Sequence, residues 1–421
     1  MPSYILTLYL EKKLVLTALA WRKIVDASYF LLSAVLLVVV AACGDGHAPA
    51  ASATSISGEI IPISVNRGHA SVKVFINNQP FTFLLDSGAD QNVINARAAT
   101  QLGLPLSAQT VPGNGAAGSY GQVHWIDIAE IQIGRARLPR QAAFVVPLPE
   151  EATFDGVLGA PFFQAFVVQM DFQQKQLQLH SHTSFVAPVN ATPVPIKFQN
   201  NKLLVNASAA GVSGWYVIDT GDASALTMFT PTVEKYALRQ AFSPRVRMVT
   251  GIGAGGAFTE NDVVRVPDLQ IGPFRMTQVI TGLSLATEGA FGHPMADTIG
   301  NLGSGIWRRF NVTFDTANEV MYLQANEAFA QPFDGPRSGL TAALDHTRLK
   351  VIQVIPSSPA AQAGVQLGDI IASIETGGST YFDNAMISET LHGAAGALIV
   401  LHLIGADGLE RQASLILRDL L

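Results

Sequence analysis

Two short segments of the chain carry carboxylates in a pattern that suits acid–base catalysis. They read Asp86-Ser87-Gly88 and Asp219-Thr220-Gly221, and each follows an apolar run and precedes an apolar pair. Two carboxylates in contact cannot both ionise, so they share one proton and the pKa of one group is forced up. Such a pair can deprotonate a water while protonating a carbonyl oxygen. This chemistry hydrolyses a peptide bond and needs neither a metal nor a cofactor.

The residues beside each aspartate suit a rigid, buried turn. Gly88 and Gly221 allow the backbone to turn tightly, and the hydroxyls of Ser87 and Thr220 can hydrogen-bond from one segment to the other. A single Asp-Ser/Thr-Gly occurs in many turns, so the indication comes from finding two of them at matching places. Both segments must therefore be held by equivalent elements.

The region 60–326 repeats itself, which supplies those equivalent elements. After each aspartate come, in the same order, a glycine-rich stretch, a run ending in Gln-Ile-Gly and a Gly-x-Leu-Gly segment. Most of each half consists of short β-type runs between Gly, Pro and Asn, with helical turns expected at 161–166 and 305–310. The sequence predicts a mostly β fold of two duplicated lobes, 60–190 and 191–328, each supplying one aspartate.

This combination resembles the active-site signature of pepsin/retropepsin-like aspartic peptidases. Gly156-Val157-Leu158-Gly159 is similar to the family's hydrophobic-hydrophobic-glycine element, which packs beneath the catalytic loop. The resemblance covers about 60–326, and Ala89-Asp90 is closer to the retropepsin branch. It implies an aspartic endopeptidase acting on peptides or proteins, with Asp86 and Asp219 as the catalytic pair. The supporting residues of the catalytic loops would be Ser87, Gly88, Thr220, Gly221 and Asp222.

The glycine-rich stretches 113–121 and 251–258 occupy the place of this family's flap hairpins. Tyr120 is the candidate flap tyrosine, and Gly118 and Gly253 are candidate substrate-binding positions. A tyrosine that only packs on its own hairpin is the alternative for Tyr120. Both stretches also contain GxGxxG, but no helical pattern follows either one, so a nucleotide site is not predicted.

Asp222 departs from the family pattern, which usually has Ser, Thr or Ala after the glycine. A third carboxylate pointing at Asp219 would raise the pKa of the pair and move the working pH towards neutral. Alternatively, the second site is degenerate. The chain would then be a catalytically inactive envelope scaffold that binds peptides through the cleft and a C-terminal groove.

The pattern changes from about Arg337. Ser358-Pro359-Ala360, then Ala363-Gly364 and Gly368-Asp369-Ile370-Ile371, resembles the PDZ signature. The resemblance implies a PDZ domain over 335–421 that captures a C-terminal peptide by strand addition. Its carboxylate-binding loop would include Gly339 and Leu340. Alternatively, the module packs on the peptidase and binds nothing.

The N-terminus has the features of an export signal. Residues 29–42 form a run of fourteen without a charge, which suits a signal peptide better than a span of roughly 20 residues. The run ends in Val40-Ala41-Ala42-Cys43, which resembles the lipobox of bacterial lipoproteins, whose cysteine is acylated. We expect a leader over 1–43, a flexible tether over 44–59 and a periplasm-facing lipoprotein, with Gly44 favouring the outer membrane. An uncleaved hydrophobic anchor is the alternative.

The amino-acid composition narrows the classes of partner and of fold that are expected. The net charge is −6 and there is no long basic block, so nucleic acid is not an expected partner. Cys43 is the one cysteine, which excludes disulfides within the chain. Charged residues are 14% and hydrophobic residues 48% of the sequence, as suits β-rich globular domains.

Overall fold

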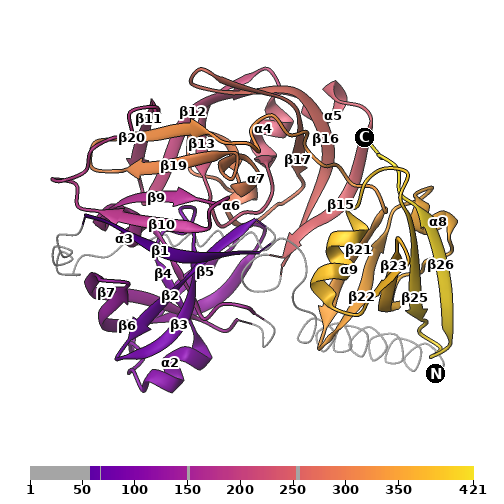
Figure 1. Cartoon of the computed structure of the whole chain (residues 1–421), viewed down its shortest axis with the longest axis horizontal. Helices are drawn as coiled ribbons and strands as arrows, with labels where there is room; N and C mark the ends of the chain where they lie inside the picture. The colour runs from indigo at the N-terminus through magenta and orange to yellow at the C-terminus, as the bar shows by residue number, and fades with distance from the viewer. Residues whose placement is uncertain (1–56, 67, 149–151, 253–256) are drawn as a thin grey trace, which may run out of the picture.

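The computed structural model describes residues 57–66, 68–148, 152–252 and 257–421. The predicted leader, Cys43 and Gly253 lie outside these residues. Strand β1 (Ser57–Asn66) begins inside the segment predicted as a tether. None of the described helices is both long enough and apolar enough to cross a membrane. Most of the described chain is β-structure, with a separate C-terminal sheet drawn in yellow in Figure 1.

The first lobe is built on strands hydrogen-bonded in the order β2-β3-β8-β4-β7-β6-β5. The pairs β3–β8 and β4–β7 are parallel, and the others are antiparallel. The strands are β2 (His69–Ile76), β3 (Gln79–Leu85), β4 (Asn92–Asn95), β5 (Val111–Asn114), β6 (Ser119–Ile133), β7 (Ala136–Val146) and β8 (Gly156–Leu158).

The second lobe repeats this arrangement with strands in the order β12-β13-β18-β14-β17-β16-β15. Its two parallel pairs, β13–β18 and β14–β17, correspond to those of the first lobe. The strands are β12 (Lys202–Ala209), β13 (Val212–Ile218), β14 (Leu226–Met228), β15 (Arg245–Ile252), β16 (Phe258–Ile271), β17 (Phe274–Ser284) and β18 (Thr298–Leu302).

A further sheet joins the two lobes, with strands in the order β1-β10-β9-β19-β20-β11. Each lobe supplies half of it, and the antiparallel pair β9–β19 crosses from one lobe to the other. The strands between the lobes are visible in Figure 1. Their bounds are β9 (Val167–Asp171), β10 (Gln176–His180), β11 (Thr192–Gln199), β19 (Phe310–Asp315) and β20 (Val320–Ala325). This sheet fixes the lobes to one another because its ladder is continuous across them.

Short helices follow the sheets at equivalent places. The predicted helical turns are confirmed as α3 (Ala160–Ala165) and α7 (Ser304–Trp307). Helix α2 (Ala96–Leu102) begins at Asn95, whose side chain accepts a hydrogen bond from the N–H of Arg97, and ends at Gly103 with a φ of 63°. The second lobe also contains α4 (Thr230–Lys235), α5 (Leu238–Ala241) and α6 (Gly289–Gly292).

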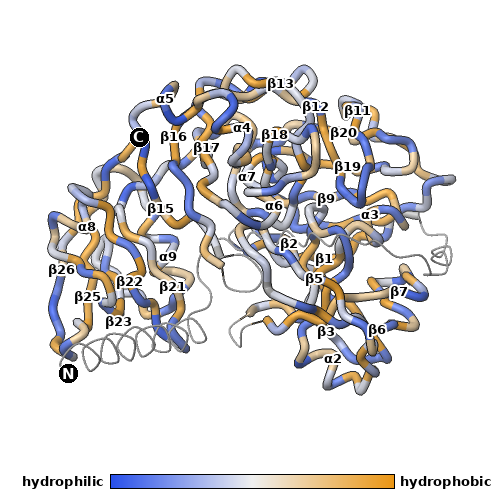
Figure 2. The backbone as a smooth tube through the Cα atoms, turned by 180° about the vertical axis from the view of Figure 1, so that it is seen from behind, coloured by the Kyte–Doolittle hydropathy of each residue, from blue (hydrophilic) through white to orange (hydrophobic). Residues whose placement is uncertain are grey.

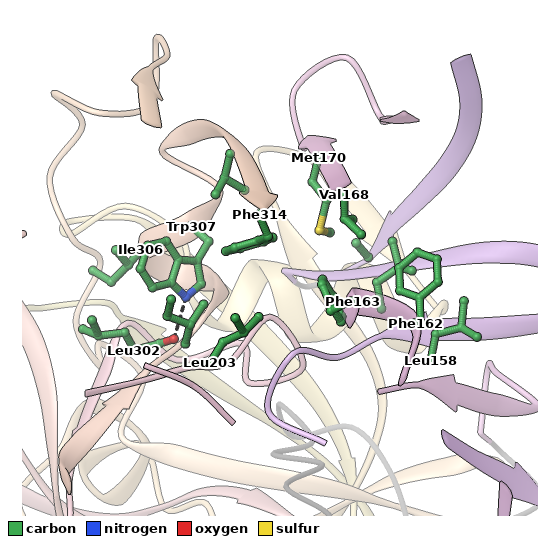
Figure 3. Packing of buried hydrophobic residues seen from close by; sticks show 14 of the residues in the cluster. Leu158, Phe162, Phe163, Val168, Met170, Leu203, Leu302, Ile306, Trp307 and Phe314 are labelled. Carbon is green, nitrogen blue, oxygen red and sulfur yellow. Dashed lines mark hydrogen bonds between the residues drawn. The ribbon is translucent and has the colours of Figure 1, made fainter. Parts of the chain in front are cut away.

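An aromatic core lies where the two lobes meet, as Figure 3 shows. Phe163 of the first lobe and Phe314 of the second pack edge to face, with ring centroids 5.7 Å apart. Trp307 is fully buried, and its Nε1 donates a hydrogen bond of 2.6 Å to the carbonyl of Leu302. Aromatic packing of this kind adds to the free energy of area burial, so the core stabilises the joint between the lobes.

The C-terminal sheet has the order β21-β22-β23-β25-β26, with β24 paired to β23. It consists of β21 (Leu340–Asp345), β22 (Arg348–Val354), β23 (Ile370–Thr376), β24 (Ser379–Tyr381), β25 (Leu398–Ile404) and β26 (Glu410–Ile416), with helices α8 (Pro359–Gln362) and α9 (Asn384–Leu391). Gln353 accepts a hydrogen bond from the N–H of Val249 in β15, and Arg265 pairs with Asp419 at 2.8 Å. Figure 2 shows this sheet beside β15 from behind.

Candidate active site

The structure brings Asp86 and Asp219 together at the ends of equivalent strands. Asp86 follows β3 and Asp219 follows β13, and each of these strands runs parallel to a Gly-x-Leu strand. The N–H of Asp86 donates to the carbonyl of Leu158 at 3.1 Å, and that of Asp219 donates to Leu302 at 2.9 Å. Each of the two carboxyl groups acts on the pKa of the other, and both side chains are fully buried.

The hydroxyls of Ser87 and Thr220 bind the two loops to one another reciprocally. The N–H of Ser87 donates to Oγ1 of Thr220 at 3.0 Å, and the N–H of Thr220 donates to Oγ of Ser87 at 3.1 Å. Each hydroxyl then donates across the pair, Ser87 to the carbonyl of Ile218 and Thr220 to that of Leu85, both at 2.8 Å. All four groups are buried and satisfied, so the loops are held in one geometry.

The glycines of both motifs allow the close approach of the carboxylates. A Cβ at Gly88 would overlap the side chain of Asp219, and a Cβ at Gly221 would overlap that of Asp86. Neither glycine has a positive φ, so the requirement is for space rather than for an unusual backbone conformation. Any larger residue would push the two aspartates apart.

Hydrogen bonds and burial divide the two carboxylates into different states. Oδ1 of Asp86 accepts from the N–H groups of Gly88 and Ala89, and Oδ1 of Asp219 accepts from those of Gly221 and Asp222. Burial, followed by the charge of Asp219, raises the pKa of Asp86 well above its usual range. Burial also raises the pKa of Asp219, but the hydrogen bond from Asn301 opposes that rise. The donor on Asn301 therefore favours the charge on Asp219 and the shared proton on Asp86.

Asn301 is a site residue that the sequence analysis did not single out. Its Nδ2 donates to Oδ2 of Asp219 and to Oδ2 of Asp222, each at 2.9 Å. In the duplicated first lobe, Ala89 and Val157 stand at the positions of Asp222 and Asn301, and both are packed in an apolar cluster. Comparing the two Gly-x-Leu-Gly segments position by position would have found the asparagine.

The carboxylate of Asp222 accepts several hydrogen bonds. Ser224 donates to it through its N–H and its hydroxyl, both at 2.8 Å, in addition to the bond from Asn301. Burial, followed by the charge of Asp219, raises the pKa of Asp222 to about 6. The group is therefore protonated in acid and carries a charge at neutral pH, next to the catalytic candidates.

A buried cation was also not anticipated. Lys202, at the start of β12 in the second lobe, forms an ion pair with Asp90 and donates to the carbonyl of Gly88 in the first. Both charged side chains are almost entirely buried. The positive charge lowers the pKa of Asp86 and of Asp219 against the effect of burial. A lysine beginning an otherwise apolar run, Leu203-Leu204-Val205, was the available signal.

The remaining predicted residues lie elsewhere. Gly118 ends the turn before β6, close to Ala257 of the second lobe. The backbone of Tyr120 belongs to β6, but its side chain lies outside the described residues, as do Gly253 and Cys43. Gly339 has a φ of 72° and packs against Ser358, and Leu340 begins β21 with its side chain buried in the C-terminal core.

No group of three or more His, Cys, Asp or Glu side chains within the described ranges is placed to hold a metal. Residues 72–162 match the protein-family model described as "Aspartyl protease", a segment that contains Asp86. No curated protein matches the chain. Among solved structures, it is similar to the aspartic proteinase from Irpex lacteus at 12% identity, over 65% of this chain and 99% of that one, with a TM-score of 0.43.

Proposed function

We propose that the chain is an aspartic endopeptidase with Asp86 and Asp219 as its catalytic pair. The observation that carries the proposal is the reciprocal bonding of the two loops through Ser87 and Thr220, which presents two buried carboxyl groups facing one another. A structural role alone would not require two carboxylates to be buried against each other, because their mutual repulsion and desolvation both cost free energy. The family match over 72–162 supports the same class.

With one carboxyl group ionised and the other protonated, the pair supplies both the general base and the general acid of the reaction. Ionised Asp219 takes a proton from a water as its oxygen attacks the peptide carbonyl carbon, while Asp86 gives its proton to the carbonyl oxygen. The tetrahedral diol then returns a proton to Asp86 as the C–N bond breaks, and the leaving nitrogen takes the proton held by Asp219. Water is consumed, no covalent intermediate forms, and both aspartates return to their starting states.

In this proposal, Asp222 is a tuning group rather than a sign of degeneracy. A degenerate site would be expected to lose its polar partners, whereas Asn301 donates to both Asp219 and Asp222, and Ser224 also donates to Asp222. The charge of Asp222 above a pKa of about 6 opposes further ionisation of the pair. We infer that the enzyme keeps the singly protonated pair into the neutral range.

The C-terminal sheet is proposed to be a PDZ domain that binds peptide C-termini and presents substrates. Strand β21 is the end strand in the order of this sheet, which leaves one of its edges for an added peptide strand. The loop containing Gly339 would receive the peptide carboxylate, with Leu340 at the start of the receiving strand. Binding of peptides with free and amidated C-termini tests this role, since amidation should abolish it.

The N-terminal pattern supports a proposal about location. Cys43 would carry the lipid anchor, and the chain would face the periplasm, attached to the outer membrane. Labelled palmitate should be incorporated by the chain and lost in Cys43→Ser. Incorporation that persists in this variant would contradict the proposed lipidation site.

Cleavage of a mixed peptide library from acid to neutral pH tests the endopeptidase proposal. Either of the charge-removing variants Asp86→Asn and Asp219→Asn should abolish cleavage, because each carboxyl performs one half of the reaction. Asp127→Asn, on the exposed face of β6, is the matched control. If the parent protein cleaves nothing at any pH, even with peptides offered to the C-terminal domain, the inactive scaffold becomes the better conclusion.

A further inference from the structure

The strands of the two lobes pair in the same order, so their residues can be compared position by position. Val93 lies opposite Val157 on β4 and β8 of the first lobe. Thr227 lies opposite Asn301 on the equivalent strands, β14 and β18, of the second lobe. The other equivalent positions, first lobe before second, are Ala89 and Asp222, Val123 and Asn261, Phe144 and Gly282, and Val146 and Ser284.

These positions are apolar in the first lobe and polar in the second. All of the first-lobe residues pack in a single apolar cluster. In the second lobe, Gly282 leaves room where Phe144 stands in the first, and the other positions hold a polar set: Asp222, Thr227, Asn261, Ser284 and Asn301. No member of the polar set is more than 2% exposed. Burying polar groups costs free energy that apolar side chains at the same places avoid, so stability alone does not account for the polar set.

The polar set extends from the candidate catalytic pair across the second-lobe sheet. Asn301 contacts Asp219 directly, through its hydrogen bond of 2.9 Å. Directly paired residues project to the same face of a sheet, so Thr227 and Gly282 lie on the face of Asn301. A Cβ at Gly282 would lie 3.0 Å from Cγ of Asn261, which places the Asn261 side chain over Gly282 on that face. This polar face therefore begins at a candidate catalytic aspartate.

Both asparagines of the polar set have a buried oxygen without a partner among the described residues. Nδ2 of Asn301 donates to two carboxylates, so the free atom is its Oδ1. Nδ2 of Asn261 donates to Oγ1 of Thr250 at 2.5 Å, and that hydroxyl gives its own proton to the carbonyl of Thr259 at 3.2 Å. Oδ1 of Asn261 is therefore free as well, and so is Oγ1 of Thr259, two residues away on β16. Amide oxygens only accept hydrogen bonds, so this face lacks donors.

We propose that the polar set selects a substrate side chain that donates N–H groups, that of glutamine or lysine, beside the cleaved bond. The inference rests on the proposed endopeptidase function and specifies its substrate class. A donor from the substrate would satisfy the free oxygens of Asn261 and Asn301, whereas an apolar side chain would leave them buried and unpaired. Asp219 is itself fully buried in this structure, so burial does not separate the polar set from the candidate site.

A peptide series that carries glutamine, lysine or methionine at one position at a time tests this selection on the full chain. The three side chains are similar in length, but methionine has no donor. At one position beside the cleaved bond, kcat/KM should be at least about 10-fold higher for glutamine or lysine than for methionine. A preference for glutamine would assign recognition to the amide oxygens, and a preference for lysine would add the charge of Asp222. Methionine cleaved equally well or better at every position would overturn the proposal.

Two variants that restore first-lobe residues identify the selecting side chains. Asn261→Val removes one free oxygen, and the ratio of kcat/KM for the preferred donor peptide to that for the methionine peptide should fall by about 10-fold. Thr227→Val is nearly isosteric, so it keeps the fold testable, and should lower the same ratio by at least about 3-fold. Asn206→Val makes the matched change at an exposed position of β12 and should leave the ratio in place. Ratios that stay constant in both Asn261→Val and Thr227→Val would show that the polar set has only a structural role.

Binding measured without cleavage separates failure of this inference from failure of the proposed function. The probes are three peptide isosteres with a hydroxyethylene group at the scissile position, which differ only in carrying glutamine, lysine or methionine beside that group. Calorimetry should show the glutamine or lysine isostere binding at least about 10-fold more tightly than the methionine isostere, with the difference lost in Asn261→Val. This result supports the polar subsite even if no peptide is cleaved, in which case only the endopeptidase proposal fails. Equal binding of the three isosteres, or binding of none, would overturn the subsite.

Discussion

Asp219 and Asp222 accept hydrogen bonds from one and the same nitrogen, Nδ2 of Asn301, at 2.9 Å each. A charge on either carboxylate therefore acts on the other through a short, buried path. The first lobe has Ala89 and Val157 at the positions of Asp222 and Asn301, so the duplication has become chemically unequal at this point. The additional polar residues of the second lobe lie beside Asp219, the aspartate on which the charge is favoured.

Removing the third charge should move the activity profile. Two unit charges about 4 Å apart interact by about 1 kcal/mol in water and about 4 kcal/mol at an effective dielectric of about 20, which corresponds to about 1–3 pH units. Ionised Asp222 resists the second ionisation of the pair, so Asp222→Asn should move the alkaline limb of kcat/KM to lower pH by about 1 unit. The pH dependence of peptide cleavage measures this shift. Asp127→Asn removes an exposed charge of the same sign and should leave the limb in place.

The free energy of unfolding should also depend on pH through Asp222. The pKa of Asp222 is raised from 3.8 to about 6 in the folded protein, so the folded state retains a proton that the unfolded chain has released between about pH 4 and pH 6. The stability from this group is complete below pH 4 and falls by up to about 3 kcal/mol as the pH rises through 6. In urea unfolding, the free energy of unfolding of Asp222→Asn should rise relative to that of the parent protein as the pH increases over this interval. A constant difference between the two at pH 4 and pH 7 would contradict the assignment.

The asparagine and the third carboxylate should depend on one another. Asn301→Val removes one donor from each of two buried carboxylates and should cost about 2–4 kcal/mol of unfolding free energy. Asp222→Ala with Asn301→Val restores the pattern of the first lobe. Its cost should be smaller than the sum of the two single changes by at least about 1 kcal/mol, measured by urea unfolding. Additive costs would mean that the two residues act independently.

The buried ion pair between Lys202 and Asp90 should stabilise the contact between lobes. Lys202→Met leaves a buried, uncompensated carboxylate and should cost about 3–5 kcal/mol. Asp90→Asn in the same protein should recover part of the loss, because the remaining amide carries no charge. Loss of the cation should also raise the pKa values of Asp86 and Asp219, moving both limbs of the activity profile upward. Thermal unfolding together with the pH profile of cleavage checks both effects.

Much of the fold was open to prediction because its signals are local. The repeat of short apolar runs predicts two β-rich halves, and the segments 161–166 and 305–310 predict helical turns, which form α3 and α7. Helix α2 was not predicted, although Asn95 and Gly103 are good capping residues. Its seven residues are too short for a clear helical period, so only the caps indicated it.

The residues of the candidate site could be identified from the amino-acid sequence alone. Asp86 and Asp219 stand in matched motifs, and small residues follow them wherever the backbone must approach closely. These features can be read from the chain because they depend on local conformation and on an internal repeat.

The surroundings of those residues, in contrast, depend on how the chain folds. The ion pair of Lys202 with Asp90 and the burial of Ala116 by the second lobe join positions far apart in the chain. Such contacts depend on the relative placement of two lobes, which residue spacing does not encode. The protonation of the pair follows from burial and from neighbouring charges, and these arise only when the chain is folded.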